Sequence, residues 1–169
     1  MTLVLLGLKR KRALFLVNHM YQGTNSKHWE KKRRLLNSIG HSIGKGTKIV
    51  GPVRIYGKLI VGEDVWLGEN FTVHGLGQVI IGDRCDIAPD VTCLTGSHEI
   101  GDTKRRAGQG TTNDITIGNG CWICARSTLI GPTIIGEASV ISAGCVVTKE
   151  VPANVLIGGV PGKIIKSLE

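Results

Sequence analysis

Aliphatic residues recur at every sixth position along most of this chain. From residue 43 the positions are Ile43, Ile49, Ile55, Val61, Leu67, Val73 and Val79. After a slip of two residues at GLGQ they resume at Ile81, Ile87 and Cys93. The pattern is broken between residues 97 and 114, and it then returns without error at Ile117, Ile123, Leu129, Ile135, Ile141 and Val147.

A period of six matches neither the 3.6-residue repeat of a helix nor the alternation of a flat strand. The chain must turn after each short strand, and Gly, Ala, Asn and Asp between the aliphatic positions tolerate the positive φ of such turns. Three six-residue segments make one triangular coil, and stacked coils bury the aliphatic positions. The pattern predicts an all-β parallel β-helix over residues 43–154 with an extended loop at 97–114. A helical cap over 1–42 precedes it, and a segment with a short helix over 155–169 follows.

Composition is consistent with a single narrow domain. The 169 residues include 24 glycines, and aromatic residues are only 4%. The five cysteines are odd in number, and the apolar start is followed by KRKR rather than a cleavage site, so we expect reduced thiols in the cytoplasm. Cys121 and Cys124 form a CxxC, but no second ligand pair accompanies them, and no metal is expected.

Positive charge is concentrated at the N-terminus. Residues 1–36 contain nine Lys and Arg and one acidic residue, although the whole chain has a net charge of +8. Apolar MTLVLLGL and ALFLV flank KRKR, and KHWEKKRRLL follows. This arrangement predicts short helices that cover the first coil, with possible peripheral contact to an anionic membrane at its inner face. Nucleic-acid binding is not expected, because no recognised motif or interleaved aromatic residues accompany the charge.

The run IGNGCW-ICARST-LIGPTI-IGEASV-ISAGCV-VTKEVP, followed by ANVLIGGVPGKII, resembles the hexapeptide-repeat acyltransferases. It is most similar to the galactoside, maltose and polysaccharide O-acetyltransferases, over roughly residues 43–168. The resemblance implies a left-handed helix, acetyl-CoA as donor, and a homotrimer with active sites between subunits. It implies acetyl transfer to a hydroxyl of a sugar, a polysaccharide or a lipid-linked saccharide precursor.

Transfer to a hydroxyl needs a base for the acceptor proton, and histidine is suited to this task. His98 lies in LTGSHEIG, where the six-residue pattern breaks, and a loop of this length is usually functional. We therefore expect His98 to be the general base, with Glu99 as a residue that either orients its ring or faces solvent. His74 is the alternative base, because VHGLGQVIIGD loosely resembles a stretch of the serine acetyltransferases; otherwise it is a candidate substrate contact.

The resemblance also assigns the donor site. It implies contacts with the thioester and the pantetheine arm, and two lysines at the 3′-phosphate of CoA. The implied residues are, in that order, Ala125, Ala143, Thr148, Lys149, Lys163 and Lys166. The two lysines could equally be solvated, and Trp122 could line the CoA channel or pack between subunits.

The acceptor site is less well defined. In the galactoside and maltose enzymes an N-terminal segment and an early coil contact the sugar, but here the family's amide position falls on Gly68. Asn70 lies nearby as a candidate substrate contact, or as a turn residue. Two other functions remain open. One is serine or xenobiotic acetylation on the same fold, and the other is a non-catalytic β-helix scaffold.

Overall fold

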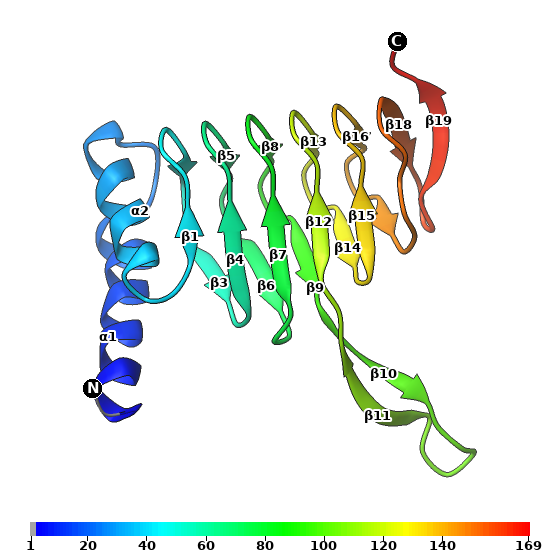
Figure 1. The fold of residues 1–169 in the computed structure, drawn as a ribbon, viewed down its shortest axis with the longest axis horizontal. Coiled ribbons are helices and arrows are strands. Elements are labelled where there is room, and N and C mark those ends of the chain that lie inside the picture. Colours follow the sequence, from blue (N-terminus) through cyan, green and yellow to red (C-terminus); the bar gives the residue numbers. More distant parts are fainter. Residues whose placement is uncertain (1–2) are drawn as a thin grey trace.

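The computed structural model describes residues 3–169 as a left-handed parallel β-helix with helices at one end and a hairpin projecting from its side (Figure 1). The two N-terminal residues of the predicted cap lie outside the described residues. The strands form three parallel faces, and each coil contributes one strand to each face in turn. We call the edges between them corner 1–2, corner 2–3 and corner 3–1.

The bounds of the strands follow the order of the coils. Face 1 contains β1 (Ser42–Ile43), β4 (Lys58–Val61), β7 (Gln78–Ile81), β12 (Ile115–Ile117) and β15 (Thr133–Ile135). Face 2 contains β2 (Lys48–Ile49), β5 (Trp66–Leu67), β8 (Asp86–Ile87), β13 (Trp122–Ile123), β16 (Val140–Ile141), β18 (Val155–Gly158) and β19 (Lys163–Ser167). Face 3 contains β3 (Val53–Ile55), β6 (Phe71–His74), β9 (Thr92–Leu94), β14 (Thr128–Ile130) and β17 (Val146–Val147). The hairpin consists of β10 (Gly96–Ile100) and β11 (Ala107–Thr112).

The six-residue pattern forms the core. On face 2 the aliphatic positions stack in one buried column of Ile49, Leu67, Ile87, Ile123, Ile141 and Ile157. Equivalent buried columns run along the other two faces. Burial of each such side chain stabilises the fold by roughly 1.5–3 kcal/mol, which supports a solenoid that has few aromatic residues.

The slip at GLGQ is confirmed by the register of face 1. Ser42 pairs with Ile60 one coil later, and Ile60 pairs with Ile80, two residues further on than the regular spacing gives. The extra residues form a turn at corner 3–1, where Gly75 has a φ of 95° and Leu76 is exposed. Because the coil on either side keeps its inward residues, the insertion changes the surface and leaves the core continuous.

Residues with positive φ make the turns at two corners. The non-glycine ones are Asp64, Asn70, Arg84, Asp90, Arg126, Ala138 and Asn154. Small and short polar residues at the corners are therefore confirmed, whereas the two arginines were not anticipated. Asn70 has a φ of 57°, and its side-chain amide donates to Asp90 Oδ1 on the next coil at 2.9 Å.

The N-terminal segment covers the first coil, as the apolar and basic pattern predicted. It contains α1 (Leu3–Phe15), a π-helical turn η1 (Leu16–Met20), a 3₁₀ turn η2 (Ser26–His28) and α2 (Trp29–Asn37). Val17 and Leu36 are fully buried against the coil. Lys32 is also buried; its ammonium donates to the carbonyls of Gly23 and Val50, at 2.9 and 3.1 Å, and burial lowers its pKa to about 8.

The C-terminal helix predicted from the sequence is wrong. After a turn at Pro161 and Gly162, the chain forms β19, which pairs antiparallel with β18 at the end of face 2. Ile164 and Ile165 are β-branched and favour a strand, and the edge of β18 offers unpaired backbone groups. The segment therefore ends the sheet rather than forming a helix. Among the helices of residues 3–169, none has the length and apolarity needed to cross a bilayer.

Candidate active site

His98 lies on a hairpin that leaves the solenoid at corner 3–1 (Figure 1). Where the sequence predicted an irregular loop over 97–114, β10 and β11 pair antiparallel, and His98 stands opposite Gly110. Every residue of β10 is exposed. Alternating Gly and Thr residues in GQGTT permit the close pairing of β11, and this signal was missed because the apolar pattern is lost there. The imidazole is therefore carried outside the core and is accessible.

The base of the hairpin is fixed by one buried threonine. The hydroxyl of Thr95 donates to the carbonyl of His74 at 2.8 Å and accepts from the N–H of Gly77 at 3.2 Å. The carbonyl of Thr95 accepts from the N–H of Asn113 at 2.7 Å, which closes the hairpin. Since Thr95 is fully buried, these bonds anchor the hairpin to the coil before it.

His74 lies at the end of β6, on the same corner as the hairpin. Its ring is exposed and stacks on Tyr56, with centroids 5.6 Å apart. Asn70 lies at corner 2–3 in a turn and lines a hollow of about 310 Å³ with Pro52, Arg54 and Thr72. His74 and Asn70 are therefore on different corners, and the structure does not bring these two candidate acceptor contacts together.

The residues assigned to the thioester end lie at corner 2–3. Ala125 follows β13, and Ala143 stands at the equivalent place one coil later, after β16. The two turns are joined by a hydrogen bond from the N–H of Gly144 to the carbonyl of Ala125, at 3.0 Å. Small residues here leave the backbone open to a ligand that approaches along the corner.

The remaining donor residues lie further along the chain. Thr148 and Lys149 are exposed after β17, at corner 3–1, where Lys149 lines a hollow of about 500 Å³ together with Asp114 and Ile134. Lys163 and Lys166 are exposed on β19, at the end of face 2. Side chains on this edge strand are free to reach a phosphate without disturbing the core.

A single chain does not bring His98 next to Ala125. The hairpin leaves between β9 and β12, at corner 3–1, whereas Ala125 lies between β13 and β14, at corner 2–3. Face 3 separates the two corners. A reaction that uses both residues therefore needs two chains side by side, with the hairpin of one beside corner 2–3 of the other.

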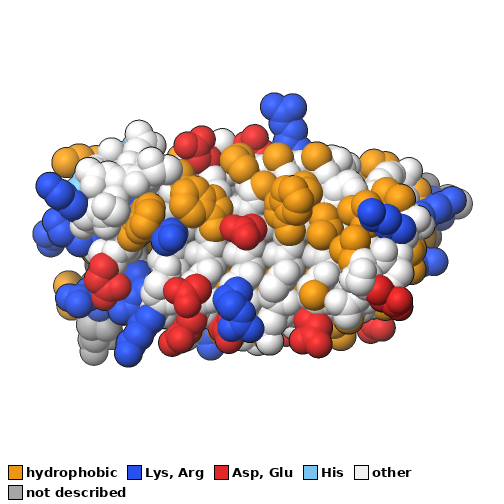
Figure 2. Space-filling model, turned by 90° about the horizontal axis from the view of Figure 1, so that it is seen from above, with side chains coloured by type: hydrophobic (Ala, Val, Ile, Leu, Met, Phe, Trp, Pro, Cys, Tyr) orange, Lys and Arg blue, Asp and Glu red, His pale blue; other side chains and the backbone are white. Residues whose placement is uncertain are grey.

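Sequence reasoning missed a pocket on the outer surface of face 2. Trp66, Asp86, Ala88, Pro89 and Trp122 line a hollow of about 490 Å³. Seen from above, hydrophobic side chains gather along the solenoid in Figure 2. The three strands that carry these residues are neighbours only after two coils and the hairpin have been closed, so the cluster is visible only once the register is known.

Comparison with known proteins identifies the repeat. The family model described as bacterial transferase hexapeptide (six repeats) matches residues 114–149. The galactoside O-acetyltransferase of Escherichia coli K12 is 32% identical over 163 residues, which cover 95% of this chain and 78% of that protein.

Two solved structures share both fold and sequence with the chain. A galactoside acetyltransferase in complex with coenzyme A has a TM-score of 0.81 at 31% identity, covering 97% of this chain and 82% of that one. A maltose O-acetyltransferase from Clostridium difficile 630 has a TM-score of 0.79 at 29% identity, covering 98% of this chain and 89% of that one.

Proposed function

The chain belongs to the bacterial hexapeptide-repeat transferases and is a CoA-dependent acetyltransferase, and we propose that its acceptor is a hydroxyl of a sugar or saccharide precursor. His98 is the general base in this proposal. The observation that carries it is the position of His98, exposed on an anchored hairpin that interrupts an otherwise continuous solenoid.

The chemistry assigned to His98 is a proton transfer coupled to acyl transfer. The neutral imidazole accepts the proton of the acceptor hydroxyl while the hydroxyl oxygen attacks the thioester carbonyl carbon. The carbonyl electrons move onto oxygen, where backbone N–H groups at the corner of Ala125 stabilise the negative charge. As the tetrahedral intermediate collapses, the carbon–sulfur bond breaks, and the imidazolium returns its proton to the CoA sulfur. The products are an O-acetyl ester and CoA.

Donor binding extends from corner 2–3 to the end of face 2. In the proposal Ala125 and Ala143 contact the thioester end and the pantetheine arm through their backbone, and Thr148 and Lys149 continue that contact. Lys163 and Lys166 hold the 3′-phosphate of CoA, for which exposed ammonium groups are suitable partners. The separation of these residues over two corners supports a donor site shared by two chains.

We further propose a homotrimer with an active site at each interface. The placement of His98 and Ala125 on different corners of one chain favours this arrangement, because a head-to-tail ring brings the two corners together at each contact. Light scattering measures the assembly directly. Co-expression of His98→Ala with Ala125→Glu tests the shared site, since random mixing restores up to roughly a quarter of the sites. A monomer, or no restored activity, argues against the shared site.

The activity test is acetyl-CoA turnover with sugars, nucleotide sugars and serine. We expect transfer to saccharide hydroxyls, and a loss of kcat of about 10²–10⁴-fold in His98→Ala. A matched variant is His19→Ala, which removes an exposed histidine on the opposite side of the first coil. An undiminished rate in His98→Ala would overturn the assignment of the base, and preferred transfer to serine would overturn that of the acceptor.

We also propose that the cap contacts anionic membranes. α1 exposes Leu5, Leu8 and Phe15 together with Lys9 and Lys11. Basic side chains near an anionic surface contribute roughly 1 kcal/mol each, and exposed apolar side chains add their burial.

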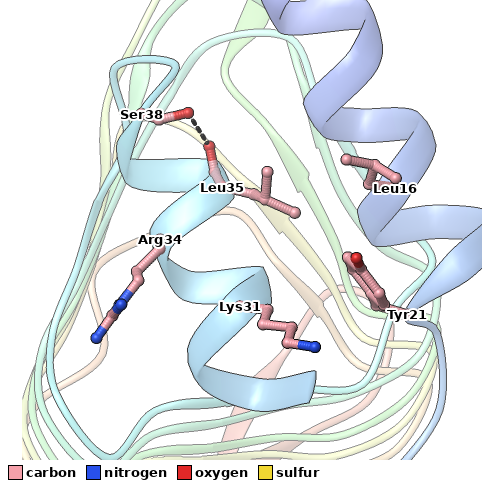
Figure 3. A pocket seen from close by; sticks show the side chains of 6 residues that line it. All are labelled: Leu16, Tyr21, Lys31, Arg34, Leu35 and Ser38. Atoms are coloured by element: carbon pink, nitrogen blue, oxygen red, sulfur yellow. Dashed lines mark hydrogen bonds between the residues drawn. The ribbon is translucent and has the colours of Figure 1, made fainter. Parts of the chain in front are cut away.

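A second feature of the cap supports the same proposal. Figure 3 shows a largely apolar hollow between the two helices, of about 320 Å³, lined by Leu16, Tyr21, Lys31, Arg34, Leu35 and Ser38. Co-sedimentation with vesicles of anionic or neutral lipid, at low and moderate salt, tests the contact. Binding that is absent or independent of lipid charge would exclude it.

A further inference from the structure

Asp86 lies directly between two tryptophans on the outer surface of face 2. In the register of the sheet Trp66 pairs with Asp86 on one side, and Trp122 pairs with it on the other. The carboxylate is exposed, Trp122 is 53% exposed, and the three side chains line the hollow of about 490 Å³. Two indole walls with a carboxylate between them therefore form one open pocket.

The fold does not require an acidic residue at this position. Asp is among the residues least favoured in strands, and β8 would pair equally well with a β-branched residue there. The ion pairs of residues 3–169 do not include Asp86, and no hydrogen bond from its carboxylate supports a turn. An unfavourable residue that stabilises nothing nearby is characteristic of a binding site.

One wall of the pocket is held in place before any ligand arrives. Trp29 of α2 meets Trp66 edge to face, with centroids 6.2 Å apart and an interplanar angle of 80°. The ammonium of Lys48 lies 5.2 Å from the centre of the Trp29 ring and covers its other side. The helical cap thus braces Trp66, and a fixed aromatic surface costs less entropy to bind than a mobile one.

The pocket opens onto the corner that carries Ala125. Pro89, at its edge, accepts a hydrogen bond from the N–H of Arg126 at 3.0 Å, and the N–H of Ala88 donates to the carbonyl of Ile123 at 2.9 Å. The residue between these two contacts on the later coil is Ala125. A molecule that fills the pocket therefore lies beside the corner to which the thioester end was assigned.

The dimensions and chemistry select a particular kind of acceptor. Two strand spacings of about 4.8 Å separate the tryptophan backbones by roughly 10 Å. Carbon contacts of about 3.5–4.0 Å on each side leave more room than one flat ring needs, and a puckered sugar ring fills it better. Sugar rings offer C–H faces to the indoles and hydroxyl donors to a carboxylate, whereas an anionic substituent would be repelled by Asp86.

We propose that Trp66, Asp86 and Trp122 form an acceptor subsite that selects neutral saccharides over anionic ones. The inference rests on the proposed function and adds to it the charge class of the acceptor. Asp86 accepts hydrogen bonds from ring hydroxyls, the indoles pack on the ring, and the bound sugar directs a free hydroxyl toward corner 2–3.

The test compares Asp86→Asn with Glu63→Gln, which removes an equally exposed acid at corner 1–2. For a neutral hexoside we expect Asp86→Asn to raise the acceptor KM by about tenfold, since it loses charge-assisted hydrogen bonds. For the matching uronic acid its KM falls, and the ratio of the two kcat/KM values shifts by at least about tenfold. Glu63→Gln leaves that ratio unchanged.

The stacking contribution is measured with Trp66→Ala and Trp66→Tyr. Loss of the indole raises the neutral-acceptor KM by about 5–100-fold, in line with the energy of stacking on an aromatic ring, and Tyr recovers part of it. Quenching of tryptophan fluorescence by the hexoside, without acetyl-CoA, reports binding independently of turnover.

The outcomes separate the two proposals. Transfer to sugars that His98→Ala abolishes, with an unchanged neutral-to-anionic ratio in Asp86→Asn, overturns the subsite and keeps the proposed function. If no sugar is acetylated, the proposed function fails. If, in that case, fluorescence still shows Asp86-dependent binding of the hexoside, the subsite stands without it; unchanged fluorescence in wild type overturns the subsite too.

Discussion

The ring of His74 stacks on the ring of Tyr56, with 5.6 Å between centroids and 17° between planes. This contact separates two roles for His74. In His74→Phe the stacking is retained and the ring nitrogens are lost, so we expect kcat to stay within about twofold while the acceptor KM rises a few-fold. Steady-state kinetics beside His98→Ala decide the matter. A fall in kcat as large as that of His98→Ala would make His74 the base.

Lys163 and Lys166 extend from an edge strand that the core does not need. Replacing both with Ala removes two positive charges from the assigned phosphate contact, so we expect the KM for acetyl-CoA to rise by about tenfold or more. Acetyl-dephospho-CoA, which has no 3′-phosphate, is used equally well by both proteins. Lys58→Ala, another exposed lysine on a strand, is the control and leaves both values unchanged. Equal effects on the two donors would remove the phosphate from the assignment.

His41 makes stability depend on pH. It is 6% exposed; Nδ1 accepts from the N–H of Leu59 at 3.3 Å, and Nε2 has no hydrogen-bond partner. Burial, followed by the charge of Arg10, lowers its pKa from 6.5 to about 4. The unfolded chain therefore binds a proton first, and stability that is full above pH 6.5 is lost as pH falls toward 4, by up to about 3 kcal/mol.

Urea unfolding between pH 8 and pH 4 measures this loss. His41→Asn keeps an acceptor for Leu59 but cannot take up a proton in this range, so the slope assigned to His41 disappears from its pH profile. An identical decline in the variant and the wild type would assign the acid sensitivity to other groups.

Gly118 shows how closely the coils approach at corner 1–2. A Cβ at this residue would lie 2.6 Å from the nitrogen and 2.9 Å from the Cα of Glu137, which are backbone atoms that cannot move aside. We expect Gly118→Ala to lower the free energy of unfolding by about 1–3 kcal/mol. Gly7, inside α1, has no atom within 4 Å of such a Cβ, and Gly7→Ala should raise stability by about 0.5–1 kcal/mol. Thermal or urea denaturation of both variants gives the comparison.

The fold could be predicted because each inward residue carries its own evidence. Ile117, Ile123 and Leu129 show the period of six without reference to any other part of the chain, and stacking follows from it. The end of the chain had no such period. KIIKS contains two adjacent isoleucines that suit either a helix or a strand, and only the open edge of β18 decides between them.

The candidate site was predictable only in part. His98 could be found because it lies where the repeat fails. Asp86 and the two tryptophans could not, because outward positions show no period and their proximity depends on the pairing of three separate coils. The sequence also gives no measure of distance between corners, so the separation of His98 from Ala125 appears only in three dimensions.

The buried anchor at Thr95 has a consequence for how this protein can diversify. Ile80 on one side of the hairpin pairs with Thr116 on the other, so the stack continues as if the intervening residues were not there. Mutations, insertions or deletions beyond the anchor are thereby insulated from the stability of the core. Selection can remodel the arm that carries the base while the donor channel stays intact, which makes new acceptors accessible by small evolutionary steps.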